Sequence, residues 1–181
     1  MQKNVIIYGL IAGTIVSTIM LLSINLIGHD EASNIDLSTS MLIGYASMVI
    51  AFSLVFVGIR NYRNKYNGGV ISFGMAFKVG ILIVLVASTM YVVAWLINYF
   101  FFTPDFIERY SAQVIAELKA GGASQAEIDK EAKSMESFAK MYKNPFFNAM
   151  ITYVEILPVG LVVTVISSLI LKRRTPKSAT A

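Results

Sequence analysis

The stretch FFNAMITYVEILPVGLVVTVISSLIL, Phe146 to Leu171, decides the fold class. A helix that crosses a membrane needs about 20 apolar residues. This stretch is longer than that, and Glu155 is its only charged residue. Its apolar side chains fall on all sides of a helix, whereas a helix of a soluble bundle has a polar face. The stretch therefore predicts a helix surrounded by lipid.

Three other segments have the same character, at 5–27, 41–59 and 73–102. The whole chain is 56% hydrophobic and 14% charged, compared with about 25% charged residues in a typical soluble domain. These features predict an all-α, polytopic membrane protein in which residues 1–181 form one membrane domain with four transmembrane helices.

The positions of the basic residues predict the orientation of these helices. Basic residues next to spanning helices stay on the cytoplasmic side. The densest clusters follow the second and fourth segments: Arg60, Arg63, Lys65, Lys172, Arg173 and Arg174. We therefore expect both termini in the cytoplasm and a location in the bacterial cytoplasmic (inner) membrane. The same clusters favour anionic lipid as a partner rather than nucleic acid.

Residues 103–145 predict an extracytoplasmic helical hairpin between the third and fourth spans. Thr103, Pro104 and Asp105 are typical of a helix start with proline in the first position. Gly121 and Gly122 end that helix near Ala120. Ser124 followed by Glu127 predicts a capping box for a second helix, which runs to about Lys143.

Each hairpin helix carries apolar residues at helical spacing. The first stripe contains Phe106, Tyr110, Val114 and Leu118, and the second contains Ile128, Ala132, Met135 and Phe138. The simplest interpretation is that the two stripes pack on each other. The alternatives are that they bind an envelope protein or lie on the bilayer surface.

Glu155 and Pro158 are the most unusual residues of the fourth span. Glu155 is nine residues from Phe146, which is about 13 Å at 1.5 Å per residue. Acids in spanning segments are costly and are often functional. Pro158 cannot donate to the carbonyl of Val154, so we expect a kink there. Glu155 and Pro158 share a helix face, which we expect to point inward. Glu155 has either a protonatable functional role or a structural hydrogen-bonding role.

Lys78, near the cytoplasmic end of the third span, is a candidate partner for Glu155. The simpler interpretation is that Lys78 extends to the membrane interface, which would take its charge away from Glu155.

Small residues recur at four-residue spacing in three of the spans: Gly9, Gly13 and Ser17, then Ala76 and Gly80, and then Gly160 with Thr164 and Ser168. In lipid, such ridges mark faces where helices approach closely. They predict either packing within one chain or a homo-oligomer.

The composition argues against most enzyme classes. The chain has no cysteine and one histidine, His29, so a catalytic triad or a multi-histidine metal site has few candidate residues. The glycine pairs lack the pattern of a phosphate-binding loop. We expect no catalytic residues, no metal and no cofactor.

Three stretches resemble a family of bacterial membrane proteins called domain of unknown function 4199: NGGVISFGMAFKVG (Asn67 to Gly80), WLINYFFFTPDFIERY (Trp95 to Tyr110) and MYKNPFFNAMITYVEILPVGLVVTVISSLIL (Met141 to Leu171). The resemblance covers nearly the whole chain. It implies an integral membrane protein and supplies no catalytic residues.

Two functions are therefore expected in order of preference. The first is a structural or accessory membrane subunit whose hairpin meets an envelope partner. The second is a small oligomeric transporter or channel with Glu155 as a protonatable site. An intramembrane enzyme ranks last, because only one central ionisable residue is visible.

Overall fold

The computed structural model describes residues 1–27 and 37–173. These residues form six helices: α1 (Gln2–Ile27), α2 (Leu37–Tyr66), α3 (Phe73–Phe101), α4 (Phe106–Ala120), α5 (Gln125–Tyr142) and α6 (Pro145–Leu171). By length and composition, α1, α2, α3 and α6 are apolar enough to cross a membrane. The all-α class and the four membrane-spanning-type helices are confirmed.

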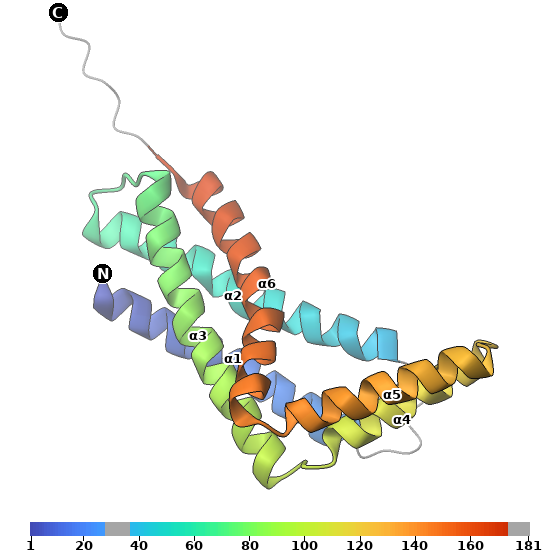
Figure 1. The fold of residues 1–181 in the computed structure, drawn as a ribbon. Helices are drawn as coiled ribbons and strands as arrows, with labels where there is room; N and C mark the ends of the chain where they lie inside the picture. Colours follow the sequence, from blue (N-terminus) through green and yellow to red (C-terminus); the bar gives the residue numbers. More distant parts are fainter. Residues whose placement is uncertain (28–36, 174–181) are drawn as a thin grey trace, which may run out of the picture.

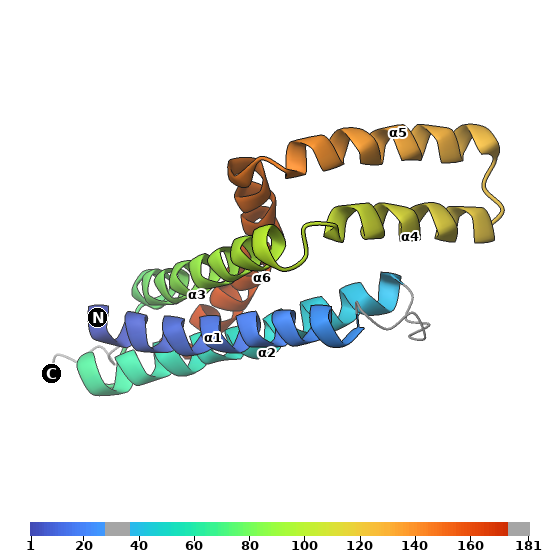
Figure 2. The same ribbon diagram turned by 90° about the horizontal axis from the view of Figure 1, so that it is seen from below.

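The four long helices form one bundle, from which α4 and α5 project sideways (Figures 1 and 2). Helix α3 packs on α1 and α6, and α2 packs on α1, α3 and α6. An antiparallel bridge between Ile71 and Arg173 joins the link between α2 and α3 to the residues that follow α6. The start of α1, the end of α2, the start of α3 and the end of α6 therefore lie at one end of the bundle, which we call the basic end. The other end, where α4 and α5 attach, we call the α4–α5 end.

The second long helix extends well beyond the predicted segment 41–59. It begins at Leu37 and continues to Tyr66, because the polar residues after Ile59 remain helical until the turn at Gly68 and Gly69. These two glycines have φ values of 61° and 81°, a left-handed conformation that side chains with a Cβ disfavour.

The bundle is closely packed through its glycines. A Cβ atom added at Gly9 would lie 2.6 Å from Cβ of Val86, and one at Gly80 would lie 2.7 Å from Cγ2 of Thr164. Such contacts bring helix backbones together and increase dispersion attraction, which drives helix association in lipid. The surrounding core includes Phe52, Val55, Ile83, Val84 and Ile156, each fully buried.

A second core fastens α4 and α5 to the bundle. It is built on Trp95, Tyr99, Ile107 and Tyr142, with Phe106, Phe138 and Phe147 packed against it. The ring of Phe106 meets that of Trp95 edge-on, with centroids 4.9 Å apart, and Tyr142 meets Tyr99 in the same way at 5.2 Å. The α4–α5 pair is thus held at its base by aromatic side chains from α3 and α6.

The predicted start of the first hairpin helix is wrong by two residues. Helix α4 begins at Phe106, and Pro104 lies in the preceding turn. The reason is that Thr103 completes the end of α3 instead of capping α4. Its amide donates to the Asn98 carbonyl at 2.9 Å, and its hydroxyl accepts from Asn98 Nδ2 at 2.9 Å.

The predicted capping box of the second hairpin helix is confirmed. The Ser124 hydroxyl accepts from the Glu127 amide, and the Glu127 carboxylate accepts from the Ser124 amide at 2.8 Å. The hydrogen bond from the Ser124 side chain holds the pKa of Glu127 below its usual value.

Candidate functional site

Glu155 lies on the outer surface of the bundle, near the middle of α6. Both Glu155 and Pro158 are exposed, so the expectation that they point inward is wrong. The inward stripe of α6 is formed by Asn148, Thr152, Ile156 and Gly160, and Glu155 lies beside this stripe. Helix α6 continues through Pro158. A charged carboxylate in hydrocarbon costs at least about 2.5–3.5 kcal/mol, so Glu155 requires an unusual environment.

Phenol groups provide part of that environment. The Tyr91 side chain, on α3, is 7% exposed. It lies within electrostatic range of Glu155, Tyr142 and Tyr45. Tyr91, on α3, and Tyr142, on α5, therefore lie within electrostatic range of the one acid of α6, and Tyr45, on α2, lies within range of Tyr91. We call Tyr45, Tyr91, Tyr142, Thr152 and Glu155 the Glu155 cluster.

A buried hydrogen-bond network joins this cluster to the base of the α4–α5 pair. Trp95 Nε1 donates to the Tyr142 hydroxyl and to Asn148 Oδ1, both at 2.9 Å. The Thr152 hydroxyl donates to the Asn148 carbonyl at 2.8 Å and shares a hydrogen bond with Tyr142. Such networks fix side-chain positions because each buried polar group depends on its neighbours.

Tyr142, at the end of α5, has a strongly altered acidity. Burial raises the pKa of Tyr142 to about 12. The hydrogen bond from Trp95 opposes this increase, and the Glu155 carboxylate adds to it. The phenol therefore stays protonated at neutral pH and serves as a hydrogen-bonding group.

Lys78 is exposed on α3, two residues after buried Ala76. Ion pairs in the part of the chain that the structure describes join Asp105 with Arg109, Glu136 with Lys140, and Glu108 with Lys143. Lys78 and Glu155 are not paired there.

The predicted small-residue faces are used for packing within the chain. Gly13, on α1, approaches α3, where an added Cβ would lie 2.8 Å from Sδ of Met90. Gly9 approaches Val86 of the same helix. Gly160 faces Val84 and Phe52. Ala76 is fully buried, and Ser17 is buried with a hydroxyl that has no hydrogen-bond partner among the described residues.

The basic end contains the residues expected to meet anionic lipid, but Arg63 has another role. Its Nη1 donates to the Leu171 carbonyl at 3.2 Å, which satisfies a free acceptor at the end of α6. Arg60, Lys65, Lys172 and Arg173 are exposed. Arg174 and His29 lie outside the described residues.

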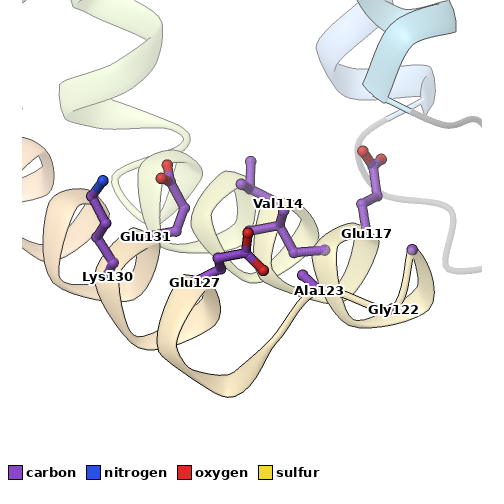
Figure 3. Close-up of a pocket in the computed structure, with 9 residues that line it drawn as sticks. Val114, Glu117, Gly122, Ala123, Glu127, Lys130 and Glu131 are labelled. Atoms are coloured by element: carbon purple, nitrogen blue, oxygen red, sulfur yellow. The ribbon is translucent and has the colours of Figure 1, made fainter.

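The α4–α5 pair carries two open grooves. Figure 3 shows the first, of about 630 Å³, which is lined by Val114, Leu118, Lys130 and three glutamates, Glu117, Glu127 and Glu131. The second, of about 660 Å³, has apolar residues such as Ile115 and Met135 between charged side chains. The described residues contain no group of histidine, cysteine and acidic side chains suited to a metal ion.

The apolar stripes of α4 and α5 are mostly half-buried. Phe106 and Tyr110 stack on each other with centroids 6.4 Å apart, and Phe106 packs on Trp95. Phe138 contacts Tyr142 and Phe147. At their bases, these stripes therefore fasten the pair to the bundle.

The fold and the site define a class of helical protein with four membrane-spanning-type helices and two amphipathic helices inserted before the last of them. Residues 7–173 match the family described as Protein of unknown function (DUF4199), so the chain belongs to that family and the resemblance seen in the sequence is confirmed. Neither the curated proteins nor the solved structures contain a match.

Sequence reasoning found Glu155 but missed the groups around it. Tyr45, Tyr91 and Trp95 lie in other apolar segments, and aromatic residues are ordinary in spanning helices. The sequence of α6 did contain one indication of a polar site. Asn148, Thr152 and Glu155 are separated by four and three residues. Such spacing places polar groups on one side of a helix.

Proposed function

We propose that this protein is a structural or accessory subunit of the bacterial cytoplasmic membrane, without catalytic activity, whose α4–α5 pair presents a surface to an envelope protein. The chain termini are cytoplasmic and the pair is extracytoplasmic. The exposed basic residues Arg60, Lys65, Lys172 and Arg173 meet anionic lipid headgroups at the cytoplasmic face.

The observation that carries this proposal is the rigid attachment of the α4–α5 pair. Trp95, Tyr142 and Asn148 form a buried hydrogen-bonded set at its base, and Thr103 locks the end of α3. From this base, helices of 15 and 18 residues project sideways from the bundle (Figure 2). A fixed projecting surface suits a scaffold that positions a partner.

The orientation supports the same role. Basic residues gather at the opposite end of the bundle from the pair, which agrees with the tendency of basic residues to remain cytoplasmic. The chain contains no cysteine, so single cysteines report on topology directly. In intact cells, an impermeant maleimide should label Ala126→Cys, on α5, and should spare Asn64→Cys, on α2, until the membrane is opened. The reverse pattern would contradict the orientation.

Partner binding is tested by photocrosslinking in native membranes. A photoreactive residue at exposed Lys133, on α5, should give one discrete adduct, whereas the same residue at exposed Val93, on α3, should give lipid adducts only. The Trp95→Phe change keeps an aromatic ring, smaller than the indole, but removes the donor to Tyr142 and Asn148. It should weaken the Lys133 adduct, because the pair loses its fixed direction. A Lys133 adduct that is absent in the native protein would contradict the accessory role.

A second candidate function is a small transporter with Glu155 as its protonatable group. The specific observation in its favour is the Glu155 cluster, in which the phenols of Tyr91 and Tyr142 lie within electrostatic range of an acid near the middle of a membrane-spanning-type helix. The close packing around Gly80 and Gly160 disfavours a pore through one copy. In proteoliposomes, transport would require proton flux that Glu155→Gln abolishes. Equal flux in both proteins, or none in either, would contradict this second function.

A further inference from the structure

In a single copy of this chain, the carboxyl group of Glu155 on α6 is exposed at the surface that lipid would contact. Ionisable residues inside membranes nearly always face the protein interior or a water-filled cavity. Glu155 instead lies on the outer surface of the bundle. A surface that places a carboxyl group toward hydrocarbon requires another polar molecule to cover it.

Tyr45, on α2, is the second polar group on the same side. It is 48% exposed. The Tyr91 phenol lies within electrostatic range of both Tyr45 and Glu155, so the two exposed groups flank one buried side chain. Helices α2 and α6 pack on each other in the bundle. Two exposed groups on adjacent helices, each within range of the same buried phenol, are positioned as members of one lateral face would be.

The two groups also lie at similar distances from the starts of their helices. Tyr45 is eight residues from the start of α2 at Leu37, and Glu155 is ten residues from the start of α6 at Pro145. At 1.5 Å per residue, these spacings are about 12 Å and about 15 Å along the helices. Both helices start at the α4–α5 end. A twofold axis along the membrane normal preserves depth, so it brings Glu155 of one copy level with Tyr45 of another.

The outer ridge of α6 has the spacing of a helix-packing surface. Glu155, Pro158, Val162 and Leu169 are exposed and occupy positions of a seven-residue repeat. Such repeats allow two helices to interlock along their length. Glu155 thus lies in a ridge of exposed apolar residues on α6 that suits close packing against another helix.

We propose that two copies of this chain associate through the α2–α6 face, with the hydroxyl of Tyr45 in each copy donating to the carboxyl oxygen of Glu155 in the other. The symmetric pairing forms two identical hydrogen bonds, so the exposed Tyr45 and Glu155 of each copy both gain a partner. The inference depends on neither proposed function, because it follows from the lateral position of the acid.

The test measures association in liposomes at increasing lipid-to-protein ratios. The chain carries one fluorophore at Lys130→Cys, and single-molecule photobleaching counts the copies. The native chain should be dimeric at high protein density and dissociate on dilution. Because each change is present in both copies and removes both symmetric bonds, Glu155→Leu and Tyr45→Phe should each raise the dissociation constant about 8- to 300-fold, the range for two hydrogen bonds between spanning helices. Because both changes remove the same two bonds, the double variant should associate no more weakly than Glu155→Leu alone.

Tyr153→Phe is the matched control. Tyr153 is two residues from Glu155 and donates within its own copy to the Thr89 hydroxyl at 2.9 Å. Its removal should leave association unchanged. Glu155→Gln retains a hydrogen-bonding side chain and should associate within about 3-fold of the native chain. Trp95 fluorescence checks that each variant is folded, and Tyr45→Phe decides the outcome if Glu155→Leu does not fold.

Crosslinking locates the face. When copies with Val162→Cys are mixed with copies with Ser53→Cys, an exposed position on α2, a disulfide should form between them, whereas exposed Val93→Cys, on α3, should not form one. A native chain that is monomeric at every density would overturn the proposal, as would a Tyr45→Phe chain that associates like the native one. Crosslinks at Val93 without crosslinks at Val162 would also overturn it, since they would place the interface elsewhere.

Discussion

Replacing Gly160 by alanine should destabilise the bundle, even though alanine favours helices. A Cβ at this position would lie 3.0 Å from Cγ2 of Val84 and still closer to its Cγ1, and 3.2 Å from Cζ of Phe52. Both neighbours are fully buried. Because Val84 is branched at Cβ and surrounded by core, it has little freedom to move aside.

The expected magnitude follows from two opposing effects. Glycine to alanine in a helix gains about 1 kcal/mol, whereas overpacking a core costs about 1–3 kcal/mol. Gly44, on α2, provides the control, because nothing lies within 4 Å of an added Cβ there. The difference between Gly160→Ala and Gly44→Ala removes the helix-propensity effect, so it should equal the overpacking cost of about 1–3 kcal/mol.

The unfolding free energy is measured by denaturant titration in bicelles. Trp95 is the only tryptophan and lies in the second core, so its fluorescence reports the transition. Adding Val84→Ala to Gly160→Ala removes the clashing methyl groups. The two changes should therefore be non-additive, with a favourable coupling of about 0.5–3 kcal/mol.

Equal stability of Gly160→Ala and Gly44→Ala would refute the close approach of α3 and α6. Additive effects of Gly160→Ala and Val84→Ala would also refute it, because the two side chains would then not share one space.

Three further outcomes are expected. Asn148→Ala should lower the unfolding free energy by about 1–3 kcal/mol, because buried Trp95 loses an acceptor, and unchanged bicelle titrations would contradict this network. Because the folded pKa of Tyr142 is about 12, above its ordinary value of 10.0, its stabilising contribution is complete below pH 10 and is lost as pH rises toward 12. Tyr142→Phe should lack this alkaline loss when Trp95 fluorescence is followed against pH, and an identical profile would count against the buried phenol. Ser124→Ala should remove about 1 kcal/mol of capping energy and speed hydrogen exchange in the first turn of α5 only, whereas exchange that increases along all of α5 would show that the cap supports more than its own turn.

Much of the fold follows from local sequence. The four long apolar segments exceed the length of a spanning helix, and the Ser124 capping box uses residues three apart, so both patterns are visible without tertiary information. The start of α4 could not be predicted in the same way. Thr103 can cap the helix that follows or complete the helix that precedes, and its contact with Asn98 decides between them.

The candidate site was predictable only in part. Glu155 stands out because an acid in an apolar run is rare. Its outward direction depends on which face of α6 packs on α2 and α3, and small residues on that helix favour the stripe through Gly160. Tyr91 and Tyr142 come within electrostatic range of Glu155 only because the helices pack as they do. These residues are more than ten positions apart in the sequence, so local patterns do not reveal their proximity.

The bridge between Ile71 and Arg173 has a consequence for the order of assembly. Its two backbone hydrogen bonds, at 3.0 and 2.8 Å, join the link before α3 to the residues after α6. Since synthesis proceeds from the amino terminus, Ile71 leaves the ribosome about a hundred residues ahead of its partner. The backbone groups of Ile71 therefore lack this partner while the first three spans are made, and they gain it only after the last span has been made.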